Sequence, residues 1–285
     1  MLPSLHRGRY DAPMTTLWTE VGDRVFVRRY RFYDQDITAV LGGGAALVVD
    51  TRSTLVQARE ILDDLRELGS PPVGLVVNTH GHGDHSFGNS AFRPAVIWGH
   101  ERCVTMIRTT GDAQRASAAE EFPAIATDLA EVVLDPPDRT LTERAVLDMD
   151  GREIHLTYLG RGHTDNDIVV TIPDADVLCA GDLVENGAPP WFGDGFPMDW
   201  PATVEALLGL VGDRTVVVPG HGDHADRAFV ERCLAEIRAI ADLALAVERG
   251  ELSIEDAVAT APYPASAARE SIERALAQLR GELPA

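Results

Sequence analysis

The most constraining feature of this sequence is a histidine-rich run, THGHGDH, at residues 79–85. It directly follows an apolar segment, Val73–Val77, that has the length and composition of a buried strand. Three of the nine histidines lie in this run, and intervening glycines let the backbone turn tightly. Because imidazole and carboxylate groups are ligands that zinc accepts, the run predicts a metal-binding loop at the end of a strand.

Within this loop, the side chains divide into two neighbouring positions. His80 and His82 can turn the same way and share one ion, whereas Asp84 and His85 point to an adjacent place. A polar loop without an active-site role is the alternative interpretation. The density of ligand-type side chains within so few residues argues against it.

Three further candidate residues each follow an apolar, strand-like segment. His163 lies in GRGHTDND, Asp182 in CAGDLVENG and His221 in VVVPGHGDH. A single histidine after a strand is more often structural than functional. Loops at strand ends are positioned by a rigid sheet, however, and commonly carry site residues. The appearance of all three in this order therefore predicts one shared site.

The combined pattern, HxHxDH followed by a His, an Asp and a His, resembles that of the metallo-β-lactamase fold superfamily over about residues 20–225. The resemblance implies an α+β fold, a four-layer αβ/βα sandwich with metals at one edge of two sheets. It implies two divalent metal ions, with zinc as the expected metal. It assigns the ligands as His80, His82 and His163 for the first ion, Asp84, His85 and His221 for the second, and Asp182 as a bridge.

The chemistry implied by this ligand set is hydrolysis by a metal-bridging hydroxide. The substrate class is a small ester, thioester, lactone or lactam, and Asp84 can move protons in addition to binding metal. Asp50 matches a family aspartate after an early strand and is interpreted as structural support near the site. The sequence contains neither a GxSxG motif nor a phosphate-binding loop, which disfavours serine hydrolases and P-loop enzymes.

Several alternatives remain within the same fold. A mononuclear iron oxidoreductase that resembles persulfide dioxygenases uses mainly the first-metal ligands, so His85 and His221 count against it. One β-lactamase subgroup places a cysteine at the second metal where this chain has Asp182, and the ligand set is more similar to that of glyoxalase II and the lactonases. Few basic residues occur beyond about residue 245, which argues against glutathione thioesters.

Composition limits the partners and the compartment. The 285 residues include 45 Asp plus Glu against 25 Lys plus Arg, a net charge of −20, which disfavours nucleic acids and anionic membranes. A small-molecule substrate is therefore expected. Residues 1–14 lack the apolar run of a signal peptide, no segment reaches the length of a membrane span, and three scattered cysteines suggest a reducing compartment. These features predict a cytoplasmic protein; they do not give its oligomeric state.

The predicted domains are a catalytic domain at residues 1–245 and a helical C-terminal extension at 246–285 packed on it. Strands are expected at residues 25–27, 37–41 and 45–49, followed by a helix that begins after Thr54. Residues 100–133 are expected to be helical; plain packing is the favoured interpretation, and an insertion that covers a site is the alternative. For the aromatic residues that follow Asp182, packing and an apolar wall beside the metals are equally favoured interpretations; they are Trp191, Phe192, Phe196 and Trp200.

Overall fold

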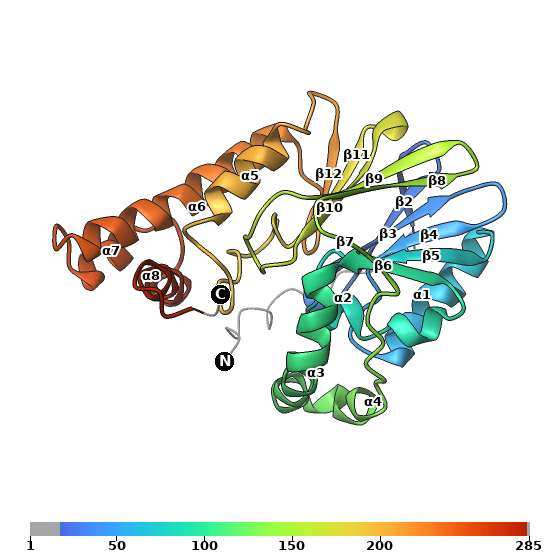
Figure 1. Ribbon diagram of the computed structural model, residues 1–285, viewed down its shortest axis with the longest axis horizontal. Coiled ribbons are helices and arrows are strands. Elements are labelled where there is room, and N and C mark those ends of the chain that lie inside the picture. Colours follow the sequence, from blue (N-terminus) through green and yellow to red (C-terminus); the bar gives the residue numbers. More distant parts are fainter. Residues whose placement is uncertain (1–17, 284–285) are drawn as a thin grey trace.

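Two β-sheets form the centre of the protein, and helices cover the outer face of each (Figure 1). The computed structural model describes residues 18–283, so the N-terminal segment with His6 lies outside the described residues. The layers run helix, sheet, sheet, helix, which confirms the predicted four-layer αβ/βα sandwich. None of the helices described is long and apolar enough to cross a membrane.

The first sheet has seven strands in sequence order, antiparallel from β1 to β4 and parallel from β4 to β7. A hairpin through Gly42 joins β3 to β4, the strands expected at residues 37–41 and 45–49. The strands of this sheet are β1 (Thr19–Gly22), β2 (Val25–Tyr30), β3 (Gln35–Leu41), β4 (Ala46–Val49), β5 (Val73–Val77), β6 (Val96–His100) and β7 (Arg139–Leu141).

The second sheet has five strands in the order β12-β11-β10-β9-β8, and only β11 and β12 are parallel. Its strands are β8 (Arg144–Met149), β9 (Arg152–Tyr158), β10 (Ile168–Ile172), β11 (Val177–Gly181) and β12 (Val216–Pro219). The sequence interpretation missed β1, β7 and β8. In β8, for example, only Leu147 and Met149 are buried, so this edge strand carries too little apolar signal to be recognised.

Alternating side chains of the first sheet pack into two different hydrophobic cores, one on each face of the sheet. In β4, Leu47 and Val49 face the second sheet and pack with residues such as Ile154 of β9. Val48 points the other way and packs on Ile61 of α1 (Leu55–Leu68). The helix begins where the sequence predicts, because the Thr54 hydroxyl accepts a hydrogen bond from Gln57 N at 3.2 Å.

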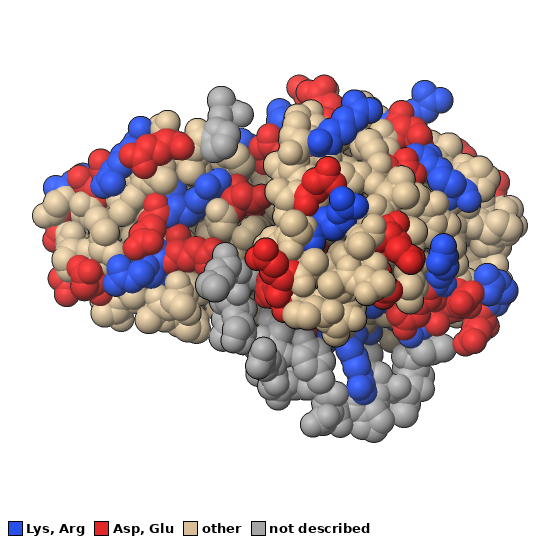
Figure 2. All heavy atoms as spheres, turned by 90° about the horizontal axis from the view of Figure 1, so that it is seen from below, with Lys and Arg blue, Asp and Glu red and all other residues tan. Residues whose placement is uncertain are grey.

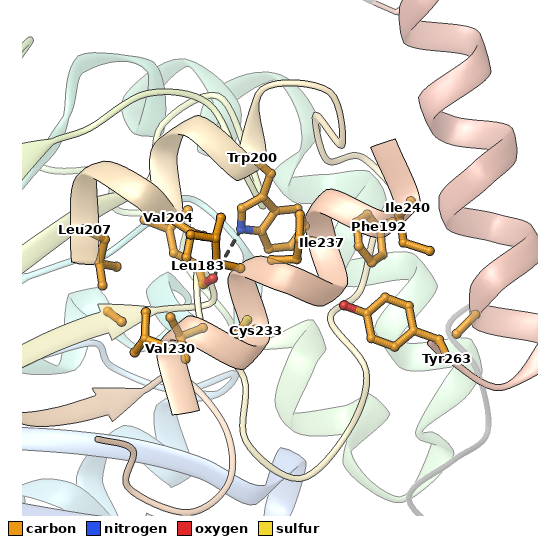
Figure 3. Close-up of a cluster of buried hydrophobic side chains, with 14 of the residues drawn as sticks. Leu183, Phe192, Trp200, Val204, Leu207, Val230, Cys233, Ile237, Ile240 and Tyr263 are labelled. Carbon is orange, nitrogen blue, oxygen red and sulfur yellow. Dashed lines mark hydrogen bonds between the residues drawn. The ribbon is translucent and has the colours of Figure 1, made fainter. Parts of the chain in front are cut away.

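The outer face of the second sheet is covered by α5 (Trp200–Leu208) and α6 (Arg227–Glu248). Figure 3 shows the buried cluster that joins these helices to the segment after β11. Within it the Trp200 indole Nε1 donates a hydrogen bond to Leu183 O at 3.2 Å. This packing fixes the chain directly after Asp182.

The C-terminal helices α7 (Ile254–Thr260) and α8 (Ala265–Leu279) pack on α6. The expected boundary at residue 245 falls inside α6, and the same buried cluster contains residues from α5, α6 and α8. The division into two domains at this position stays a prediction. The remaining helices, α3 (Glu101–Glu121) and α4 (Ala126–Ala130), lie on the side of the first sheet (Figure 1).

Candidate metal centre

The histidine-rich run leaves the end of β5 and continues into the short helix α2 (Gly83–Ser86). Its backbone is tied to the sheet, because Asn78 Nδ2 donates to His85 O at 3.0 Å. Close packing explains one glycine, since a Cβ atom at Gly83 would lie 2.4 Å from the Phe87 ring. The loop is therefore held in a single arrangement that turns its side chains toward the gap between the sheets' ends.

Three histidine nitrogens meet at one point. His82 Nδ1 lies 3.0 Å from His80 Nε2 and 2.9 Å from His163 Nε2. All three side chains are buried. Nitrogen atoms so close together suit ligands that lie about 2.0–2.1 Å from one shared zinc-type ion.

A second group of nitrogen and oxygen atoms meets beside the first. His85 Nε2 and His221 Nε2 are 3.2 Å apart, and Asp84 Oδ2 lies 3.4 Å from each of them. These residues come from the loops after β5 and β12, which face each other across the two sheets. The arrangement matches the ligand set that the sequence assigns to a second ion.

Asp182, directly after β11, lies between the two groups. Its Oδ2 is 3.4 Å from His163 Nε2 and 3.3 Å from His221 Nε2, and its Oδ1 is 3.3 Å from His85 Nε2. Asp182 Oδ1 is buried without a hydrogen-bond partner among the described residues. A buried carboxylate oxygen left in this state is costly unless a cation binds it. Asp182 thus lies within reach of both groups.

In each of the five histidines, one ring nitrogen contacts a protein oxygen and the other ring nitrogen faces the centre. Such outer contacts fix the tautomer and orientation of metal-binding histidines. The pairs are His80 with Thr79 Oγ1, His82 with Asp194 Oδ2, His85 with Asp50 Oδ2, His163 with Trp191 O and His221 with Tyr33 O, at 2.7–3.2 Å. The donor set and its orientation fit divalent metal ions.

The electrostatics of the cluster point the same way. Burial lowers the pKa of His163 to about 4, so its imidazole is neutral and able to bind metal at neutral pH. Burial also acts to lower the pKa of His85 and His221, but the nearby carboxylates of Asp182 and Asp84 together outweigh it and raise both well above the usual range. The centre therefore attracts positive charge, either as protons or as metal ions.

The structure brings together all seven residues that the sequence assigns to the site, and it adds others. Glu185 places a carboxylate oxygen within 4.8 Å of the ligand atoms of His163 and Asp182, and burial raises its pKa to about 8. Asp194 holds His82. The sequence signal that could have pointed to Glu185 was its position three residues after Asp182. No sequence signal pointed to Asp194.

Asp50 lies where the sequence predicts, beneath the site. Its carboxylate accepts hydrogen bonds from Thr79 N, Thr79 Oγ1 and His85 Nδ1, each at 2.8 Å. Within residues 18–283, the remaining histidines and Cys179 lie outside this group. His100 caps α3, His155 lies in β9, His224 is exposed and Cys179 is buried in the core.

A cavity of about 960 Å³ opens onto the centre. Its walls include Gln114 and Glu121 of α3, which favours the alternative that residues 100–133 cover a site. The aromatic residues after Asp182 divide between the two interpretations. Trp191 lines the cavity, whereas Phe192, Phe196 and Trp200 are buried in the core.

Gly220 offers a direct test of how tightly the centre is packed. A Cβ atom at this position would lie 1.8 Å from Asp182 Oδ1, so Gly220→Ala must displace the carboxylate. We expect metal affinity to fall by about 10–100-fold, as for changes that disturb ligand orientation. Competition with a chromophoric chelator measures this, and Gly44→Ala is the control because nothing lies within 4 Å of its Cβ. Unchanged affinity would show that Asp182 can move without loss.

Comparison with known proteins places these features in context. The family model described as Metallo-beta-lactamase superfamily matches residues 30–221. The type 2 metallo-beta-lactamase of Bacillus cereus is 25% identical over 175 residues, 60% of each chain. That of Bacteroides fragilis is 29% identical over 125 residues, 42% of this chain and 50% of the relative. The chain thus spans about half to three fifths of the length of these two relatives.

Solved structures share the fold. A metallo-beta-lactamase from Pontibacter korlensis has a TM-score of 0.61 and 22% identity, over 78% of this chain and 98% of that one. A stereoselective inverting sec-alkylsulfatase from Pseudomonas sp. has a TM-score of 0.74 and 16% identity, over 92% of this chain and 50% of that one. At such low identity, these similarities establish the architecture alone.

Proposed function

This chain belongs to the metallo-beta-lactamase superfamily, and on that premise we propose that it is a hydrolase that uses two divalent metal ions, with zinc as the expected metal. The observation that carries the proposal is the position of Asp182, whose carboxylate reaches histidines of both groups at 3.3–3.4 Å. In this proposal the first ion is held by His80, His82 and His163, the second by Asp84, His85 and His221, and Asp182 contacts both.

When bound, two such ions would polarise a substrate carbonyl and lower the pKa of water, so that hydroxide is available near neutral pH. The chain's own groups orient the reactants. Asp84 Oδ2 lies 3.4 Å from His85 Nε2 and from His221 Nε2, at the side of the cavity, where it can accept and return a proton. Asp84 is thus proposed both as a ligand and as a proton carrier.

The proposed substrate is a small molecule with an ester, thioester, lactone or lactam bond. The cavity is concave and largely bounded by apolar side chains, as is common for small-molecule sites. Acidic and basic side chains are interspersed on the face shown in Figure 2, and the net charge is −20, which argues against nucleic acid as a substrate. The β-lactamase names of the curated relatives favour a lactam among the four classes.

Metal analysis combined with a hydrolysis screen tests this proposal. We expect two zinc ions per chain and metal-dependent hydrolysis of at least one of the four bond types. A chelator should remove the activity, and zinc should restore it. A protein that takes up no metal under any loading condition would contradict the proposal.

The same measurements address a mononuclear iron oxidoreductase of the persulfide dioxygenase kind. One iron per chain with consumption of dioxygen would support it. The comparisons do not favour this alternative, and the close contact of His85 and His221 at 3.2 Å supports a second ion in the proposed hydrolase.

A further inference from the structure

One wall of the cavity is aromatic and comes from two distant segments. Phe32 and Tyr33 belong to the single turn η1 (Phe32–Asp34), and Phe122 follows the end of α3. The three rings pack edge to face, with centroids 4.6, 5.1 and 5.0 Å apart. Tyr33 also binds the candidate ligand His221 through its backbone oxygen, at 2.7 Å. This wall therefore has a fixed position relative to the metal centre.

Another wall of the cavity is formed by the loop after β11 and by α8. Trp191 and Ala267 line it. Arg274 of α8 ties the two parts together, because its guanidinium donates to Asp194 O at 2.7 Å and to Gly195 O at 2.8 Å. A group that binds between the two walls thus meets two preformed surfaces.

Acidic side chains stand on both walls. Glu121 at the end of α3 and Glu270 on α8 line the cavity, and within residues 18–283 neither forms an ion pair with an arginine. Partial burial raises the pKa of both carboxyls. Arg31 is the guanidinium among the described lining residues, and it already has an interaction of its own.

We propose that the substrate of this site carries a positively charged amine beside an apolar body, with the amine near Glu121 and Glu270 and the apolar part on the aromatic wall. This inference rests on the proposed function. Both the glutamates and the aromatic rings stabilise a bound cation, because carboxylates attract it and aromatic faces bind it through their quadrupole. A carboxylate at the same place would meet two like charges. The two glutamates therefore disfavour an anionic group beside them.

A matched series of esters tests the selection. The zinc-loaded protein is given the p-nitrophenyl esters of 6-aminohexanoic acid, heptanoic acid and adipic acid, which have similar length and an ammonium, methyl or carboxylate end. We expect kcat/KM to fall in that order, with a difference of about tenfold or more between the ammonium and carboxylate esters. Equal rates, or the fastest hydrolysis of the adipate ester, would overturn the proposal.

Variants assign the effect to the two glutamates. In the double variant Glu121→Gln and Glu270→Gln, the preference for the ammonium ester over the carboxylate ester should fall to about one third or less of its original value. The control double variant, Glu120→Gln with Glu273→Gln, removes the same charge from the same two helices at exposed positions outside the cavity and should keep the preference. A preference that survives in the first variant would contradict the assignment.

A binding measurement separates this proposal from the proposed function. Calorimetry compares 4-phenylbutylamine with 4-phenylbutanol on the zinc-loaded protein, so no bond needs to be hydrolysed. Tighter binding of the amine that is lost in the Glu121→Gln, Glu270→Gln variant supports the cation site even if none of the esters is hydrolysed, and that result would count against the hydrolase alone. Equal binding of the two probes would count against the cation site.

Discussion

Asp182→Asn is expected to lower kcat/KM for the best substrate by about 10²–10⁴-fold while the fold stays intact. The carboxylate lies between the two histidine groups, at 3.3–3.4 Å from histidines of each. A neutral amide keeps the shape but is a poor ligand for two cations at once. The Asp182 side chain is also buried.

Steady-state kinetics with saturating zinc, elemental analysis and circular dichroism check this expectation together. Asp213→Asn is the matched control, since this aspartate is exposed in the loop before β12. A variant that keeps full activity would disprove the assignment of two metals bridged by Asp182. A variant that loses its circular dichroism signal would show instead that Asp182 supports the fold.

The second large effect is expected in stability. Asp50→Ala removes an acceptor that three donors share at 2.8 Å, namely Thr79 N, Thr79 Oγ1 and His85 Nδ1. All of these groups are buried, so each donor is left without its partner. We expect the free energy of unfolding to fall by about 3–5 kcal/mol, the range for removing one partner of a buried charged pair.

Urea unfolding of the metal-free protein measures this loss of stability. The Asp50→Asn variant is compared with the alanine variant. Asp50 has φ +66°, a left-handed conformation that asparagine tolerates better than alanine. The asparagine variant should therefore be more stable than the alanine variant, although its amide cannot accept hydrogen bonds from all three donors. A loss below about 1 kcal/mol in the alanine variant would show that Asp50 is not a central support of the ligand loop.

That these seven side chains lie together could be predicted from the sequence, because they stand in recognisable places. His80 to His85 form one dense run, and Asp182 and His221 each directly follow an apolar strand. These strands end at the same side of the two sheets, so residues distant along the chain converge. The strand and helix patterns of residues 37–77 were equally readable, since Gly42 follows the first strand and the helix lies between its cap Thr54 and Gly69.

The cavity walls could not be predicted in this way. The repeat of apolar residues in α8 predicts a helix with a buried face, but it does not say that Glu270 points toward a site formed by other segments. The contact of Asp194 with His82 likewise joins residues 112 positions apart. Only the three-dimensional path of the chain after Asp182 brings them together.

The hydrogen bonds of Arg274 have a consequence for how such a protein can diversify. One helix braces the loop that carries Asp194 and also presents Glu270 to the incoming molecule, yet it supplies none of the seven proposed ligands. Substitutions in α8 can therefore change which compounds bind, while the seven proposed metal ligands stay the same. Selectivity and chemistry are thereby encoded in separate stretches of the polypeptide, and each is free to evolve at its own pace.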